Sequence, residues 1–154
     1  MRSKDGRPIH TRDAEVSDHA FLRALHHAAY REVITRQFGE WIECDQDDWF
    51  EKGLTDASFR IIEVDGIRVG AIGVQNAPDH VFLDALQLLP EFQNQGIGTA
   101  VLLAELESAT ALGLPVRLRV LHKNRALQWY ERHGFRITGV TETHYLMKWS
   151  GVAP

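Results

Sequence analysis

A pair of glycines, placed where an apolar strand turns into a long apolar helix, is the feature that most constrains this fold. The stretch is LLPEFQNQGIGTAVLLAEL, residues 88–106, in which Gly96 and Gly98 directly precede the helical run. Glycine costs a helix about 1 kcal/mol relative to alanine, so these two residues serve something other than helix stability. The first N–H groups of a helix lack helical partners and attract anions. The stretch therefore predicts a strand, loop and helix whose loop binds a phosphate through its backbone.

The loop also allows a simpler interpretation, in which Gly96 and Gly98 only form a tight, closely packed turn. Short glycine motifs match by chance, and two common nucleotide motifs are incomplete here. Val101 stands where the dinucleotide fingerprint needs a third glycine, and the Gly-Lys-Ser/Thr ending of a Walker A loop is missing. The segment EFQNQGIGT contains no Lys or Arg, and the nearest candidate cations in this part of the chain are Lys123 and Arg125. A phosphate would therefore depend on amides and the helix dipole.

Length and composition predict one ordinary globular domain over residues 1–154. A chain of this size can bury about 70% of its unfolded surface, and 44% apolar with 25% charged residues is a typical balance. No apolar run suggests a signal peptide or a membrane span, so we expect a cytoplasmic protein with no membrane contact. The net charge of −4 argues against nucleic acid as the main partner.

Cysteine and histidine usage argues against a metal centre. Cys44 is the only cysteine, which excludes an intramolecular disulfide and a thiolate zinc site. The eight histidines form no H-x-x-x-H pair, and His26 and His27 are adjacent, so they point apart on a helix. We expect no bound metal.

Periodicity along the chain predicts a mixed α/β domain. The Asp65-Gly66 pair between two β-rich arms predicts a hairpin. Ser17 and Asp18 are good starters for a first helix, and Asn124 can cap a late one. Strands are expected at 8–12, on both sides of Asp65-Gly66 within 58–75, and at 80–89, 116–120, 135–140 and 143–149, with helices after Asp18, at 46–54, from the loop to Gly113, and at 124–133. This order mixes hairpins with crossovers, so helices should cover both faces of a mixed sheet.

Two segments resemble signatures of the GNAT superfamily of N-acetyltransferases. LLPEFQNQGIGTAVL is similar to the family's Gln/Arg-x-x-Gly-x-Gly/Ala acetyl-CoA motif, and RVLHKNRALQWYERHGF is similar to its second signature, an Asn before a helix, a Tyr six residues on, and a closing Gly-Phe. The resemblance implies a mostly antiparallel sheet of about seven strands with a splay between strands four and five. It also implies an enzyme that acetylates an amine with acetyl-CoA as cosubstrate. Dimers are common in the family, so a homodimer is compatible with it.

Position by position, the resemblance assigns roles in cosubstrate binding. Asn124 matches the side chain that orients the cofactor arm, and Tyr130 matches the hydroxyl placed near the thioester sulfur. Gln93 stands where many members have Arg, so one charge contact is missing. The residues expected at the pyrophosphate are Gln93, Gln95, Gly96, Ile97, Gly98 and Thr99, and those expected to bind the pantetheine through their backbone are Leu88 and Leu89.

The candidate general base is Asp84. By period two, Phe82, Asp84, Leu86 and Leu88 should share one face of strand four, and some relatives have a base at this level of that strand. His80 is the second choice. A carboxylate that simply caps a strand edge or pairs with an arginine is an equal alternative.

The acceptor is expected to be a small-molecule or peptide amine. The segment YREVITRQFGEWIECDQDDWF is acidic and aromatic, and the resemblance places it on the acceptor side, where Tyr30, Trp41 and Glu43 would favour a cationic amine. A solvated acidic helix with its aromatics in the core is the simpler interpretation. Two rival functions stay open, namely a non-catalytic acyl-CoA sensor of the same fold and a nucleotide or phosphate binder.

Overall fold

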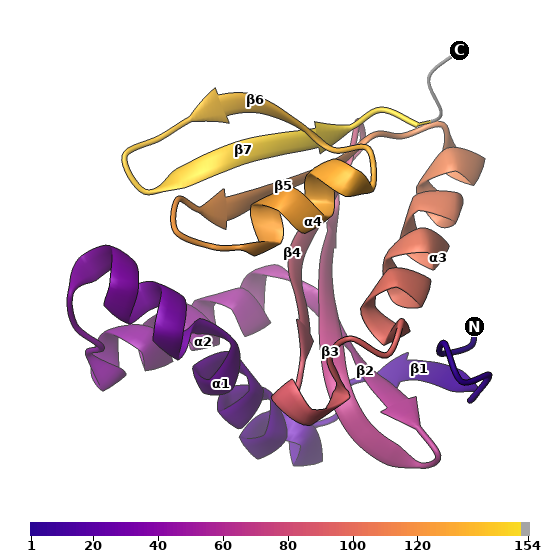
Figure 1. The fold of residues 1–154 in the computed structure, drawn as a ribbon, viewed down its shortest axis with the longest axis horizontal. Helices are drawn as coiled ribbons and strands as arrows, with labels where there is room; N and C mark the ends of the chain where they lie inside the picture. Colours follow the sequence, from indigo (N-terminus) through magenta and orange to yellow (C-terminus); the bar gives the residue numbers. More distant parts are fainter. Residues whose placement is uncertain (152–154) are drawn as a thin grey trace.

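In the computed structural model, which describes residues 1–151, Asp65 and Gly66 form the hairpin turn that the sequence predicts. Their φ angles are 54° and 76°, the left-handed values that a tight hairpin turn requires. The hairpin belongs to a seven-stranded sheet with the order β1-β2-β3-β4-β5-β7-β6 (Figure 1). The strands are β1 (Ile9–Asp13), β2 (Ser58–Val64), β3 (Ile67–Asn76), β4 (Val81–Leu88), β5 (Val116–Leu121), β6 (Arg136–Val140) and β7 (His144–Trp149).

The sheet opens between β4 and β5. These strands are parallel and pair only at Val81 with Val116 and at Phe82 with Arg117, whereas all other neighbouring strands are antiparallel. Beyond Phe82 and Arg117 the two strands separate. The predicted splay between strands four and five is therefore confirmed.

Helices cover both faces of the sheet, as predicted. On one face, Leu22 and Leu25 of α1 and Phe50 of α2 pack on Ile61 and Ala71. On the other face, α3 and α4 contribute to the larger core around β3, β4 and β5. The helices are α1 (His19–Phe38), α2 (Glu43–Asp56), α3 (Ile97–Leu112) and α4 (Ala126–Arg132), with short 3₁₀ turns η1 (Val16–Asp18) and η2 (Pro90–Phe92). None of the helices within residues 1–151 is long and apolar enough to cross a bilayer.

Two helix starts differ in detail from the sequence prediction. Asp18 does not cap α1 with its side chain; its buried carboxylate instead binds Arg12 at 2.8 Å and Arg68 at 3.2 Å. These two guanidinium groups and a backbone N–H hold the pKa of Asp18 well below its ordinary value despite burial. Asn124 caps as expected, because its Oδ1 accepts the Ala126 N–H at 2.9 Å, although α4 itself begins only at Ala126.

One prediction about β4 is wrong, because this strand contains a bulge. Val74 pairs with Leu83 but Gly73 pairs with Ala85, which leaves Asp84 as the extra residue. A bulge reverses the alternation of side chains beyond it. Leu86 and Leu88 accordingly pack on the α3 side, whereas Phe82 and Asp84 line a pocket on the other face of the sheet.

Candidate active site

The loop before α3 presents a run of free backbone N–H groups. Within residues 1–151, the N–H groups of residues 94–99 donate no hydrogen bond to any backbone or side-chain acceptor. Asn94 and Gly96 have φ angles of 63° and 80°, so the chain curls here and α3 begins at Ile97. The Gln95 carbonyl, which could accept the first helical bond from Thr99, instead accepts the Lys4 N–H at 2.8 Å. The loop is therefore a nest of unused donors at the positive end of a helix.

Gly98 is not required by the fold. Its φ angle is not left-handed, and an added Cβ would lie 3.6 Å from a Leu88 methyl and 3.8 Å from the Trp129 ring. These are ordinary van der Waals distances. A Cβ at this position would point into the space between the end of β4 and α4. Because neither the backbone conformation nor the packing requires glycine here, its presence favours a backbone that a ligand can approach closely over a merely tight turn.

The glutamine side chains of the loop are used locally. The Gln93 amide donates to the Leu88 carbonyl and the Gln95 amide to the Glu91 carbonyl, both at 3.1 Å. Both backbone groups of Leu89 are also engaged, since its N–H donates to Val69 and its carbonyl accepts from Phe92. A pantetheine contact through Leu89 or through the Leu88 carbonyl would therefore share a group that is already bonded, and the contact at these two residues stays a prediction.

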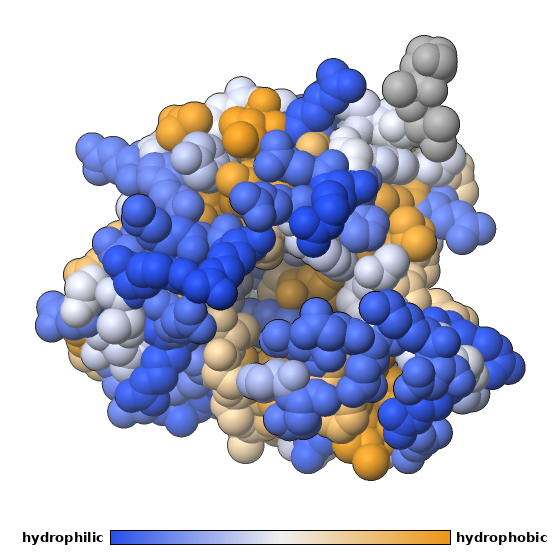
Figure 2. All heavy atoms as spheres, viewed as in Figure 1, coloured by the Kyte–Doolittle hydropathy of each residue, from blue (hydrophilic) through white to orange (hydrophobic). Residues whose placement is uncertain are grey.

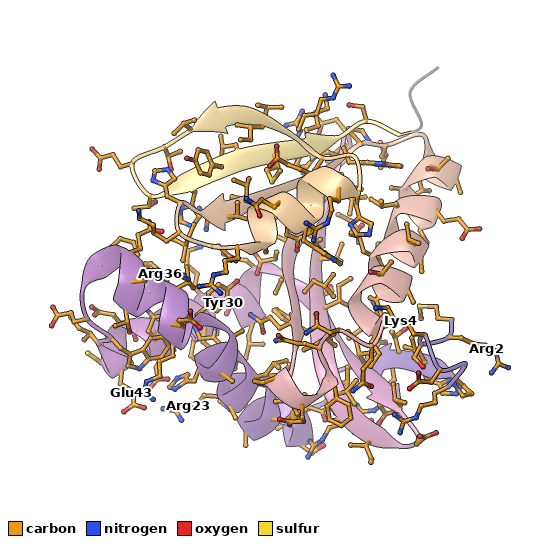
Figure 3. The ribbon with its side chains drawn as sticks, viewed as in Figure 1. Arg2, Lys4, Arg23, Tyr30, Arg36 and Glu43 are labelled. Carbon is orange, nitrogen blue, oxygen red and sulfur yellow. The ribbon has the colours of Figure 1, made fainter. Side chains whose placement is uncertain are left out.

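The cation in contact with the loop is Lys4, which the sequence did not indicate. A Cβ on Gly96 would lie 2.8 Å from the Lys4 side chain, and Figure 3 shows Lys4 beside the start of α3, with Arg2 farther out on the same segment. Arg125, by contrast, lies 3.9 Å from Glu32 of α1, and the backbone N–H of Lys123 donates to Gln37 of the same helix.

A pocket of about 1060 Å³ lies on the face that α1 and α2 cover. It extends from α2 across the open part of the sheet to the turn between β6 and β7. The space-filling view shows a hollow at the centre of the molecule, with hydrophobic residues in its depth and hydrophilic residues around it (Figure 2). The polar and charged residues of the lining are His26, Tyr30, Lys52, Asp56, Gln75, Asn76, His80, Asp84, Gln87, Arg119, Asn124, Thr141, Thr143 and His144.

Asp84 is the carboxylate at the centre of this pocket. The Gln75 amide donates to its Oδ1 at 3.3 Å, and a Cβ on Gly53 of α2 would lie 3.5 Å from its Oδ2. Burial raises the pKa of Asp84 above its ordinary value, and the Gln75 bond and the Arg119 charge oppose this increase. Such a carboxylate accepts a proton more readily than an ordinary aspartate. His80, the second choice as base, also lines the pocket, but its Nδ1 lies 2.8 Å from Asp79.

Two tyrosines near the opening of the sheet influence each other electrostatically: Tyr30 lines the pocket, and Tyr130 lies in the core that α3 and α4 cover. Burial raises the pKa of Tyr130, and the neighbouring Tyr30 raises it further. Burial also raises the pKa of Tyr30, with Gln87 opposing and Asp84 adding to the shift. Tyr30 therefore interacts electrostatically with both the candidate base and the candidate acid. The Tyr130 hydroxyl makes no hydrogen bond within residues 1–151, although the residue is only 8% exposed.

A family model for acetyltransferases matches the part of the chain that contains these features. The match, to the acetyltransferase (GNAT) domain, covers residues 55–137, from the end of α2 through the glycine loop and α4 to β6. The chain belongs to the GNAT acetyltransferase family.

Solved structures of other acetyltransferases share the fold of this GNAT protein. PaiA N-acetyltransferase from Thermoplasma acidophilum, in complex with coenzyme A, is 19% identical with a TM-score of 0.77, over 93% of this chain and 99% of that one. Naa50 from Arabidopsis thaliana, in complex with the bisubstrate analogue CoA-Ac-MVNAL, is 18% identical with a TM-score of 0.70, over 92% and 98%. The ribosomal-protein-S18-alanine N-acetyltransferase from Escherichia coli is 19% identical with a TM-score of 0.66, over 96% and 97%. No curated protein sequence matches the chain.

Of the three residues expected on the acceptor side of this acetyltransferase, only Tyr30 lines the pocket. The Trp41 ring packs beside His27, with 5.1 Å between ring centroids, in a small cluster between α1 and β5. Glu43 faces Arg23 at 3.6 Å, on a side of the helices that Figure 3 shows turned away from the sheet. Glu43, Asp47 and Glu51 of α2 pair with basic groups of α1. Asp56, which lines the pocket, pairs with Lys52 of its own helix, so Asp84 is the lining carboxylate without a cationic partner within 4.0 Å among the described residues.

Proposed function

We propose that this acetyltransferase moves an acetyl group from acetyl-CoA to a primary amine, of a small molecule or a peptide, by direct attack in a ternary complex. The observation that carries the proposal is the run of free N–H groups at residues 94–99, which includes a glycine that neither the backbone conformation nor the packing requires. Donors of this kind suit a pyrophosphate. The pocket reaches the open part of the sheet from the opposite face, so an amine and a thioester can meet between β4 and β5.

Asp84 in the pocket supplies the proton transfer, and Tyr130 in the neighbouring core supplies a hydrogen bond to the leaving sulfur. An amine with a pKa near 10.4 is neutral in about one molecule in 2,500 at pH 7, a handicap of about 4.6 kcal/mol. Asp84 takes one proton from the ammonium group, so that the neutral nitrogen can bond to the acetyl carbon. As the carbon–sulfur bond breaks, coenzyme A leaves as the thiolate, and the second proton of the nitrogen passes to this thiolate or to water. The Tyr130 hydroxyl donates a hydrogen bond to the sulfur as negative charge develops there. Tyr30 and Gln87 orient the amine and the thioester between Asp84 and Tyr130.

Calorimetric titration with acetyl-CoA tests the cosubstrate without any assumption about the acceptor. We expect acetyl-CoA to bind more tightly than 3′-dephospho-CoA and far more tightly than NADH. Equal affinity for NADH would support the nucleotide binder instead, and no binding would show that the glycines only shape a turn. Amine-dependent thiol release then distinguishes an enzyme from an acyl-CoA sensor. A sensor binds acetyl-CoA but does not release free coenzyme A thiol when an amine is added.

Gly98→Ala separates a phosphate site from a structural turn. Because the added Cβ fits the protein and alanine favours the helix, we expect the melting temperature to stay equal or rise by a degree or two, for a stabilisation of about 0.5 kcal/mol. The same methyl group narrows the space beside the loop, so the Kd for acetyl-CoA should rise about 10-fold or more. Unchanged affinity would contradict this role of Gly98. Gly113→Ala, at the other end of α3, is the control, because strain at its left-handed φ of 69° should lower stability without affecting affinity.

Lys4→Gln tests the cation in contact with the loop. The backbone bond to Gln95 survives this substitution, so only the charge is removed. We expect the Kd for acetyl-CoA to rise about 3- to 10-fold at low salt and the difference to shrink as salt screens the interaction. Lys123→Gln is the control, since Lys123 is the cation that the sequence alone would favour. Equal effects of the two variants, or none for Lys4→Gln, would contradict a contact between Lys4 and a phosphate.

A further inference from the structure

Arg119 lies opposite Asp84 across the opening of the sheet. The last residues paired between β4 and β5 are Phe82 and Arg117. One alternation further along each strand gives Asp84 and Arg119, whose side chains face the same side as that pair. Both residues line the pocket. The pocket therefore has a carboxylate on one edge of the opening and a guanidinium on the other.

The charge of Arg119 is not neutralised within residues 1–151. The other strong cation of the pocket, Lys52, is paired with Asp56, whereas no carboxylate of the described residues lies within 4.0 Å of Arg119. Its charge nevertheless acts on several neighbours: it opposes the rise that burial causes in the pKa of Asp84 and Tyr30, and it adds to the fall that burial causes in the pKa of His144. Burial also lowers the pKa of His144, so this neighbour is neutral at pH 7. Arg119 is thus an uncompensated positive charge facing a binding cavity.

Arg117 provides an internal comparison. It lies on the same face of β5, two residues earlier, and is exposed like Arg119. It does not line the pocket, and the carboxylate that it influences is Asp79, outside the pocket. The two arginines therefore share strand, face and exposure, but only Arg119 can meet a bound acceptor.

We infer that the acceptor is a small amine that also carries an anionic group, with its amine at Asp84 and its carboxylate or phosphate at Arg119. A guanidinium binds either anion through two parallel N–H bonds. An amine without an anionic group would leave Arg119 without a partner. A polyamine that carries only positive charges would be repelled by Arg119. This inference rests on the proposed function, because it names the substrate class of the same pocket.

The test compares acceptors that differ only in the anionic group. Wild-type protein with saturating acetyl-CoA is given glycine, β-alanine, 4-aminobutyrate, 5-aminovalerate and 6-aminohexanoate, each beside its carboxamide, and aminoalkyl phosphonates of the same lengths. Thiol release reports kcat/KM. We expect at least one length at which the anionic acceptor exceeds its carboxamide by about 10-fold or more, as one charge-assisted hydrogen-bonded pair allows. The phosphonates show whether the site prefers phosphate over carboxylate.

Arg119→Gln should remove that preference and Arg117→Gln should keep it, with equal melting temperatures for both variants. Carboxamides that react as well as the anions would overturn the inference, as would a preference that survives in Arg119→Gln. A protein that binds acetyl-CoA but acetylates no member of the series would overturn it as well. Failure to bind acetyl-CoA would instead reject the proposed function itself.

Discussion

Asp84→Asn is expected to lower kcat/KM for amine acetylation at pH 7 by about 10²- to 10³-fold. The substitution keeps the size of the side chain and an oxygen for the Gln75 amide, but removes the only group in the proposal that takes the proton of the amine. The variant must then use the neutral amine alone, which is about one molecule in 2,500 at pH 7. A general base contributes about 10²- to 10⁴-fold in other enzymes, which brackets this estimate.

The pH profile distinguishes this role from a structural one. Wild-type kcat/KM should rise through the pKa of Asp84, which burial places above that of an ordinary aspartate, and then level off. In Asp84→Asn, kcat/KM should increase tenfold per pH unit up to the pKa of the amine. At that pH it should approach the wild-type kcat/KM. Asp56→Asn is the matched control, because Asp56 lines the same pocket but is paired with Lys52. An unaltered profile in Asp84→Asn would rule out Asp84 as the base.

A stability measurement on Asp84→Asn tests whether its loss of activity is only a loss of folded protein. A raised carboxyl pKa means that the folded state holds the proton more tightly than the unfolded state, so the free energy of unfolding falls as pH rises through that pKa. At pH 7 Asp84 therefore lowers stability, and the asparagine variant should melt at an equal or higher temperature than wild type. The difference should vanish below the unfolded pKa of about 3.9. Lower stability at pH 7 would contradict this environment for Asp84.

Local signals in the sequence predicted most of the fold. The Asp65-Gly66 turn, the alternation of residues 116–120 and Gly96 before α3 each specify a backbone conformation within a few residues. These features can therefore be predicted without knowing which other segment of the chain they pack against. The bulge at Asp84 cannot, because it depends on the register of β4 against β3, and a period-two rule placed Leu86 and Leu88 on the wrong face.

The site was predictable where a motif is continuous in sequence and not where the fold brings distant residues together. Lys4 reaches the loop from the other end of the chain, and no local pattern connects it with Gly96. The sequence placed the arginines of residues 116–120 on one face of a strand, but only the fold shows that Arg119 faces a pocket and Arg117 does not. Similarly, Trp41 and Glu43 lie in a segment of suitable composition, while the orientation of α1 and α2 selects Tyr30.

Tyr130→Phe is expected to lower kcat by about 10²-fold while the KM for acetyl-CoA changes by less than about 3-fold. The loss is that of one hydrogen-bond donor to a developing charge in a site shielded from water. A phenol with a pKa near 10 would already protonate a thiolate with a pKa of about 8.5 at a cost of about 2 kcal/mol, and burial raises the pKa of Tyr130 still further. The hydroxyl therefore stabilises the sulfur by hydrogen bonding rather than by full proton transfer.

The raised pKa also predicts the alkaline side of the pH profile. Tyr130 should remain protonated, and kcat should show no decline due to this residue, up to pH 10. Tyr30→Phe is the comparison, because Tyr30 influences the pKa of Tyr130 but lines the pocket together with Gln87 and Asp84. We expect it to raise the KM of the acceptor more than it lowers kcat. If Tyr30→Phe instead lost kcat and Tyr130→Phe did not, Tyr30 would be the donor to the sulfur.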